Sequence, residues 1–340
     1  MRRFLALIAI PLLACVALAG CGSSSKSSAS SSSSSSSASA SASASASGGS
    51  VSGSGANTSV TATGAFGKAP AVTIPKALPG TDLTVKTLIQ GTGPALTKAD
   101  ALAANFVLYF WQGKSSSLKA STYTSSPTVI GGQMLPGLES ALVGKKVGSR
   151  VLAVIPPAQG YGTSGNSQIG VTGSTWLVFV IDVLKSYPNN AGATGAQVSN
   201  GGGNLPTVSA KTGTAPTLSF SSASPPGSLV AKTLVKGKGP AVAKGEYVIA
   251  QYTGYIWRTK KVFGSSWSSG SPFGFIIGAS PEQVIPGWDK GLAGQTVGSR
   301  VMLSVPPAQG YGSAGATQAG IKGNDTLVFV VDILDALKQG

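Results

Sequence analysis

Two glycine-rich segments have the spacing of a dinucleotide-binding loop. Residues 160–165 and 310–315 both match the pattern G-x-G-x-x-G. Such a loop binds a pyrophosphate when it runs directly from a parallel strand into the N-terminus of a helix. Here Pro156 and Pro157 interrupt the preceding strand in the first copy, and no helical periodicity follows in either. The context therefore argues against a nucleotide site.

The composition excludes several other kinds of chemistry. The chain has no histidine, which removes Ser-His-Asp and Cys-His nucleophiles and His-ligated metals. Its 340 residues include only 10 acids against 25 lysines and arginines, a net charge of +15. Few acids are thus available as catalytic pairs, and the basic residues form no stripe interleaved with aromatics. We expect no metal, no cofactor and no nucleic-acid partner, and most hydrolases and metalloenzymes are excluded.

The N-terminus has the pattern of a bacterial export signal. Arg2 and Arg3 precede an apolar run over residues 4–19, which is shorter than the ~20 residues that span a bilayer. The run ends in Leu-Ala-Gly-Cys, which looks like a lipobox, so we expect cleavage before Cys21 and lipidation of its thiol. Residues 1–20 are then a lipoprotein signal peptide, and the mature chain is exported and anchored to the outer face of the bacterial cell membrane.

The remainder divides into a tether, two domains and a linker. Residues 21–69 are rich in serine and alanine at their start and predict a flexible tether, because such a segment buries too little apolar surface to offset its ordering entropy. We expect domain 1 over residues 70–187, a linker rich in Gly, Asn, Ser and Thr over 188–215, and domain 2 over 216–340.

An internal duplication supports this division. Residues 147–151, 156–162 and 177–180 recur at an offset of 150, whereas residues 91–95 and Trp111 recur at an offset of 146. The second copy is therefore four residues longer between Trp257 and Gln283. A period this long indicates two whole domains, because solenoid repeats run to ~20–50 residues.

Each copy contains mostly strand patterns. Apolar β-branched and aromatic runs bounded by Gly and Pro predict strands in both copies, over 85–89, 106–111, 151–155, 176–184, 230–235, 247–257, 301–305 and 326–334. A short helix is expected over 138–142 and over 288–292, each opening after Pro-Gly. The fold class is α+β, with an antiparallel sheet and one helix per domain.

Four motifs in the second copy resemble FKBP-type peptidyl-prolyl isomerases in order and spacing. They are residues 284–288 (Val-Ile-Pro-Gly-Trp), 297–300, 306–312 (ending in Tyr-Gly) and 326–332. The resemblance covers about a hundred residues, twice. It implies two FKBP-like domains, each a curved antiparallel β-sheet wrapped around a short α-helix, with an apolar, aromatic-lined pocket between helix and sheet.

The resemblance also assigns pocket residues in domain 2. It implies catalytic roles for five aromatic residues, Tyr252, Phe263, Trp288, Tyr311 and Phe329. It implies substrate-binding roles for Phe273, Phe275, Val284, Ile285 and Ile321. In this assignment Trp288 is the floor under the proline ring, and the Ile285 N–H donates to a substrate carbonyl. Any one of these could simply be a core residue; the set of ten together favours a pocket.

Two departures from the family pattern stand out in domain 2. Family members usually have an acid directly after the phenylalanine that corresponds to Phe263, but this chain has Gly264 there. The histidine that some members have at the edge of the pocket is also absent. Gly264 removes a hydrogen-bonding partner, which argues against binding of the macrolides that the resemblance would otherwise imply.

Domain 1 departs further, and its pocket is predicted to be degenerate. Phe106 replaces the tyrosine, Leu118 falls at the flap phenylalanine, Lys119 at the acid, and Leu138 at the tryptophan. The degenerate pocket therefore consists of Leu138 and of the positions that keep the family pattern, Met134, Leu135, Tyr161, Val171 and Phe179. We expect this copy to bind prolyl segments weakly and to serve as a structural or protein-binding module.

Isomerisation suits a chain with this composition, because rotation about an X–Pro bond breaks no bond and transfers no proton. The expected partners are proline-containing segments of exported or unfolded proteins. The alternative is a non-catalytic chaperone or binding lipoprotein that holds such segments. A solute-binding lipoprotein would require α/β lobes, which the strand-rich pattern does not supply.

Overall fold

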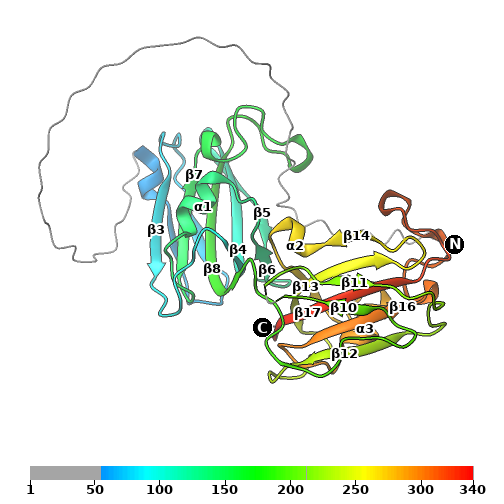
Figure 1. Ribbon diagram of the computed structural model, residues 1–340. Helices are drawn as coiled ribbons and strands as arrows, with labels where there is room; N and C mark the ends of the chain where they lie inside the picture. Colours follow the sequence, from blue (N-terminus) through cyan, green and yellow to red (C-terminus); the bar gives the residue numbers. More distant parts are fainter. Residues whose placement is uncertain (1–54, 212, 340) are drawn as a thin grey trace, which may run out of the picture.

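The computed structural model describes residues 55–211 and 213–339. The predicted signal peptide, Cys21 and the tether up to residue 54 lie outside the described residues. Two antiparallel sheets lie side by side, each with a short helix (Figure 1). No helix in the described ranges is long and apolar enough to cross a membrane.

The sheet of domain 1 has the strand order β3-β7-β8-β4-β5, and β6 pairs with β4. Its strands are β3 (Thr84–Ile89), β4 (Asp100–Gln112), β5 (Ser115–Ser121), β6 (Thr128–Ile130), β7 (Arg150–Ile155) and β8 (Trp176–Pro188). The helix α1 (Pro136–Leu142) packs against β7. A separate hairpin is formed by β1 (Thr61–Thr63) and β2 (Ala71–Thr73).

Domain 2 repeats this arrangement with the order β14-β13-β17-β16-β12-β9, and β15 pairs with β13. Its strands are β9 (Ala196–Gln197), β12 (Val230–Lys236), β13 (Tyr247–Ile256), β14 (Lys261–Ser265), β15 (Phe273–Ile276), β16 (Arg300–Val305) and β17 (Leu327–Leu337). Its helices are α2 (Ser266–Ser269) and α3 (Pro286–Leu292), and a hairpin is formed by β10 (Thr207–Ser209) and β11 (Thr217–Ser219).

These elements confirm the predicted α+β fold, in which each of two domains has an antiparallel sheet and a short helix packed on it. Both predicted helices are present, and each begins at a proline, Pro136 or Pro286, whose missing N–H costs nothing in the first turn. Every predicted strand is present. The additional one-turn helix α2 was not expected.

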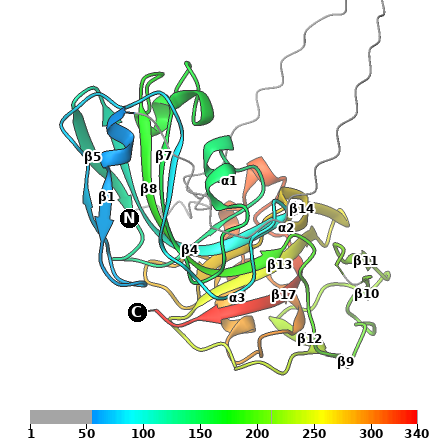
Figure 2. The ribbon, with the colours of Figure 1, turned by 90° about the vertical axis from the view of Figure 1, so that its left-hand side faces the viewer.

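Both faces of each sheet are covered, which explains why β7 and β16 carry apolar residues on both of their sides. All six residues of each strand are buried. In β16, Val301, Leu303 and Val305 pack on the helix side, whereas Met302 packs on the outer side with Leu205. Outer-side clusters include residues from the segments around β1–β2 and β10–β11. In the view of Figure 2, β1 and the β10–β11 hairpin lie at opposite sides of the molecule.

The structure differs from the predicted tether over its last fifteen residues. Residues 55–69 fold against domain 1, where Val60 is fully buried. The buried Arg150 donates from Nη1 to the Gly64 carbonyl at 2.8 Å and from Nη2 to the Lys68 carbonyl at 2.7 Å. The Gly67 N–H donates to Asp182 Oδ2 at 2.7 Å. These are polar contacts to the backbone, so the composition of the segment gave no sign of them.

The predicted linker also differs from the structure, because much of it belongs to the second domain. β9 pairs with β12, with Gln197 opposite Val235. Leu205 is 6% exposed and packs on the outer face of the sheet, and the Ala193 N–H donates to Asp332 Oδ2 at 3.0 Å. Residues 189–211 and 213–215 therefore form a strap over domain 2 rather than a free connection.

The two domains contact one another through an apolar cluster with polar edges. Ala103 and Tyr187 of domain 1 pack with Tyr247 and Ile249 of domain 2. The Tyr187 hydroxyl donates to Asp335 Oδ2 at 3.0 Å. Burial raises the pKa of the Tyr187 hydroxyl, with a further contribution from Asp335, so it remains a donor at neutral pH.

Candidate functional site

Trp288 forms the floor of an aromatic cluster between α3 and the sheet of domain 2. Pro286 starts α3, and Trp288 in its first turn is 4% exposed. The centroid of its indole lies 5.3 Å from those of Phe329 and Phe275 and 5.4 Å from that of Tyr252. The angles between the ring planes are 89° with Phe329, 67° with Phe275 and 81° with Tyr252. These near-perpendicular, edge-to-face contacts are favourable for aromatic rings.

Half-buried side chains form the rim above this floor. Phe263 on β14 lies 5.6 Å from Phe329, and Phe273 on β15 stacks on Phe275 at 5.6 Å. Tyr252 lies 5.9 Å from Phe273. The structure brings all ten predicted residues of domain 2 into one apolar cluster, with Val284, Ile285 and Tyr311 at its partly exposed side and Ile321 buried.

Two hydroxyls and one indole N–H are the polar groups of the cluster. Burial raises the pKa of Tyr252 and of Tyr311, and the neighbouring Tyr311 raises that of Tyr252 further. Both hydroxyls are therefore neutral donors across the physiological pH range. The buried Nε1 of Trp288 has no acceptor among the described residues.

Gly264 lies directly beside one of these hydroxyls. A Cβ at this position would be 3.5 Å from the Tyr252 hydroxyl oxygen, an ordinary van der Waals contact. A carboxylate there could accept the hydroxyl proton in a hydrogen bond. The glycine therefore leaves Tyr252 without the partner that an aspartate would provide.

The matching region of domain 1 is an aliphatic core. Leu138 on α1 stands where Trp288 stands in domain 2 and is fully buried. One ring pair remains, Phe106 and Phe179, with centroids 5.8 Å apart. Leu135 and Val171 are buried, whereas Met134 and Tyr161 pack at the partly exposed side of the cluster. The predicted degenerate residues thus do come together, but without an aromatic floor.

The strand register corrects two assignments in domain 1. Tyr109 pairs with Leu118, as Tyr255 pairs with Val262, and a bulge follows in both copies. Lys119, not Leu118, therefore stands at the position of Phe263, and Leu118 is 52% exposed. The Lys119 ammonium lies 5.4 Å from the centroid of Phe110. Counting along the sequence misplaced both residues, because six residues separate the paired Phe110 and Ser117, whereas four separate the matching pair Ile256 and Lys261.

The register also shows where the second copy is longer. Ile130 and Phe275 occupy matching positions, as do Leu135 and Ile285 at the start of the helices. Residues 131–134 of domain 1 thus replace the longer segment 276–284 of domain 2. No group of three or more Cys, Asp or Glu that could hold a metal ion occurs in the described part of the chain.

Comparisons with known proteins identify the same family in both halves of the chain. The model of the family described as FKBP-type peptidyl-prolyl cis-trans isomerase matches residues 93–184 and 239–334. An FK506-binding protein from Streptomyces anulatus is 38% identical over 119 residues, which are 35% of this chain and 94% of that relative. The FKBP-type peptidyl-prolyl cis-trans isomerase FkpA of Escherichia coli K12 is 37% identical over 107 residues, 32% of this chain and 37% of that relative.

Among solved structures, the crystal structure of the three FKBP domains of wheat FKBP73 aligns with 75% of this chain and 95% of its own, at 19% identity and a TM-score of 0.30.

Proposed function

Because the chain belongs to the family of FKBP-type peptidyl-prolyl cis-trans isomerases, we propose that it isomerises X–Pro bonds in exported proteins and that domain 2 carries the activity. The observation that supports this assignment is the aromatic floor and rim around Trp288, which domain 1 lacks. Domain 1 then serves mainly as a structural or protein-binding module.

The proposed chemistry requires no acid or base. The planar X–Pro amide is separated from its isomer by roughly 18–20 kcal/mol, and uncatalysed exchange takes about 10–100 s at 25 °C. The twisted amide has a smaller dipole than the planar one, so an apolar surface penalises it less. The neutral hydroxyls of Tyr252 and Tyr311 and the N–H of Ile285 supply donors for the rotating carbonyl.

The proposed location is the outer face of the bacterial cell membrane. Its support is the lipobox-like sequence that ends in Cys21. A lipid on Cys21, followed by the serine-rich residues up to 54, would hold both domains close to proteins that emerge from the membrane in an unfolded state.

Turnover of a prolyl peptide by the full chain tests the function, and two matched variants assign it to a domain. Tyr311→Phe should lower kcat/KM about 3- to 10-fold, because one hydrogen bond contributes roughly 0.5–1.5 kcal/mol. Tyr161→Phe, the same change in domain 1, should leave kcat/KM within about twofold. Equal losses from both would contradict the assignment to domain 2.

Peptide binding without any turnover would favour the alternative, a binding lipoprotein.

A gain of activity is expected from Gly264→Asp. The new carboxylate should accept a hydrogen bond from the Tyr252 hydroxyl and orient it, which should raise kcat/KM about 2- to 10-fold. The control is Ala120→Asp, since Ala120 occupies the register position of Gly264 in domain 1, where Phe106, which has no hydroxyl, stands in the place of Tyr252. An unchanged or lower kcat/KM in Gly264→Asp would show that the Tyr252 hydroxyl needs no such partner.

A further inference from the structure

A buried chain of hydrogen bonds connects the strap to the aromatic cluster. The Tyr252 N–H donates to Ser266 Oγ at 2.8 Å, and Ser266 Oγ donates to Gln251 Oε1 at 2.5 Å. Gln251 Nε2 then donates to the Asn189 carbonyl at 3.4 Å. Gln251 is fully buried and Ser266 is 4% exposed, so water competes little with this relay.

The relay ends at the part of domain 2 that carries the rim. Ser266 begins α2, which joins Phe263 on β14 to Phe273 on β15. The relay also fixes the backbone of Tyr252, which contacts both Phe273 and Trp288. A shift of α2 would therefore move three of the side chains that surround the floor.

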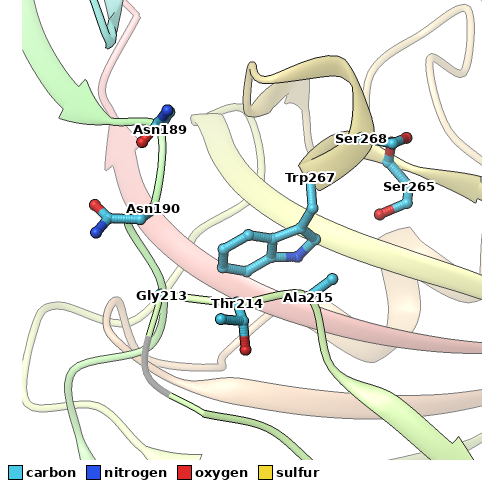
Figure 3. A pocket seen from close by; sticks show the side chains of 8 residues that line it. All are labelled: Asn189, Asn190, Gly213, Thr214, Ala215, Ser265, Trp267 and Ser268. Atoms are coloured by element: carbon cyan, nitrogen blue, oxygen red, sulfur yellow. The ribbon is translucent and has the colours of Figure 1, made fainter.

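Elements outside the second sheet surround α2 on its outer side. The indole of Trp267 lies between the strap residues Asn189 and Asn190 and the segment 213–215, beside a shallow hollow of about 410 Å³ (Figure 3). Gly192 lies against the same ring, since a Cβ there would be 3.3 Å from Trp267 Cη2.

Domain 1 lies against the C-terminal end of α2. A Cβ on Gly132 would be 2.7 Å from the Ser269 carbonyl oxygen, and a Cβ on Gly131 would be 2.8 Å from Ser271 Oγ. These glycines form the short turn that replaces residues 276–284 of domain 2, so the shortening of domain 1 makes room for α2.

We propose that Gln251 and Ser266 are positioning residues for the isomerase site, and that through them the strap and domain 1 hold the rim of domain 2 in place. This inference rests on the proposed isomerase function. It gives domain 1 a role in the reaction although its own aromatic floor is missing, because its turn is part of the surface on which α2 rests.

Domain 1 contains a natural version of the same bond. Thr122 Oγ1 accepts from the Phe106 N–H at 2.8 Å and donates to Asn105 Oδ1 at 3.1 Å. Thr122 therefore occupies the place of Ser266, next to a cluster that lacks the tryptophan. The chain itself thus supplies both a conservative replacement, threonine, and a matched control site.

The test measures prolyl-peptide turnover by the full chain at a temperature where near-UV circular dichroism shows every variant to be folded. Ser266→Ala should lower kcat/KM about tenfold, since it leaves the buried Tyr252 N–H without its acceptor and the buried Gln251 Oε1 without its donor. Ser266→Thr should restore kcat/KM to within about twofold of the wild type. Thr122→Ala should leave kcat/KM unchanged, even where it lowers the melting temperature.

A double-mutant cycle tests whether the relay acts as one unit. Gln251→Leu should lower kcat/KM as Ser266→Ala does, and the two together should cost no more than either alone. Additive losses, or a Ser266→Ala protein that is less stable but fully active, would overturn the inference and leave the proposed function standing. A wild-type chain without turnover would instead contradict the proposed function, and the inference with it.

Discussion

Trp288→Leu should remove most of the isomerase activity, lowering kcat/KM at least about tenfold, which corresponds to about 1.4 kcal/mol in the barrier. Leucine occupies this position in domain 1, so the substitution is compatible with the fold. It nevertheless removes the flat surface on which four other rings converge, namely Tyr252, Phe273, Phe275 and Phe329. The loss should appear in turnover of a prolyl peptide by the folded full chain.

The matched control for this prediction is Trp257→Leu. Trp257 is a tryptophan of similar burial, 7% exposed, but it packs on the opposite face of the same sheet with Phe220. Both variants lose a large buried side chain and should be less stable. Only Trp288→Leu should lose turnover below its melting temperature; similar losses from both variants would show that general loosening of the sheet, and not the floor, determines the activity.

The parts of the fold that follow from local patterns could be predicted. Local patterns indicate these elements directly: a Pro-Gly pair opens α1 and α3, and β7, β8, β16 and β17 are rich in apolar residues. Each pattern occurs once in each domain, so the second occurrence supports the first. The site residues could be assigned because separate motifs occur in the same order as in a known family. These side chains come together around Trp288 because the sheet places them in one cluster with it.

The parts that depend on distant backbone contacts could not be predicted. Residues 55–69 have a composition suited to a tether, but contacts with distant residues hold them on the domain, among them the bonds from Arg150 to the carbonyls of Gly64 and Lys68 and from Lys86 to the carbonyl of Val60. Lys119 was assigned to the wrong pocket position because the register of β5 depends on the length of its connection to β4, and the sequence alone does not show where that connection is longer. Ser266 carries no signal of its own among many serines, and its role emerges only once Gln251 and Asn189 are seen beside it.

Arg150→Met should destabilise domain 1 by about 3–5 kcal/mol, because it leaves Asp182 as an unpaired charge in the interior. Arg150 is 1% exposed and Asp182 is fully buried. Two hydrogen bonds of 2.6 and 2.7 Å join them, and the guanidinium also holds residues 55–69. Denaturant unfolding should show the loss directly. Limited proteolysis should show faster cleavage between residues 55 and 74, since the β1–β2 hairpin loses its anchor.

Two comparisons distinguish this explanation from a general effect of removing a cation. Lys98→Met breaks an ion pair of domain 1 whose lysine is 78% exposed, at 2.8 Å from Glu139, and should cost no more than about 1 kcal/mol. Arg150→Met combined with Asp182→Leu should recover part of the loss, because no buried charge is then left unpaired, but the hairpin should remain sensitive to protease. If Arg150→Met costs no more than Lys98→Met, the buried pair is not what joins residues 55–69 to the domain, and the buried Val60 side chain and the bonds from Lys86 to the carbonyls of Thr58 and Val60 must suffice.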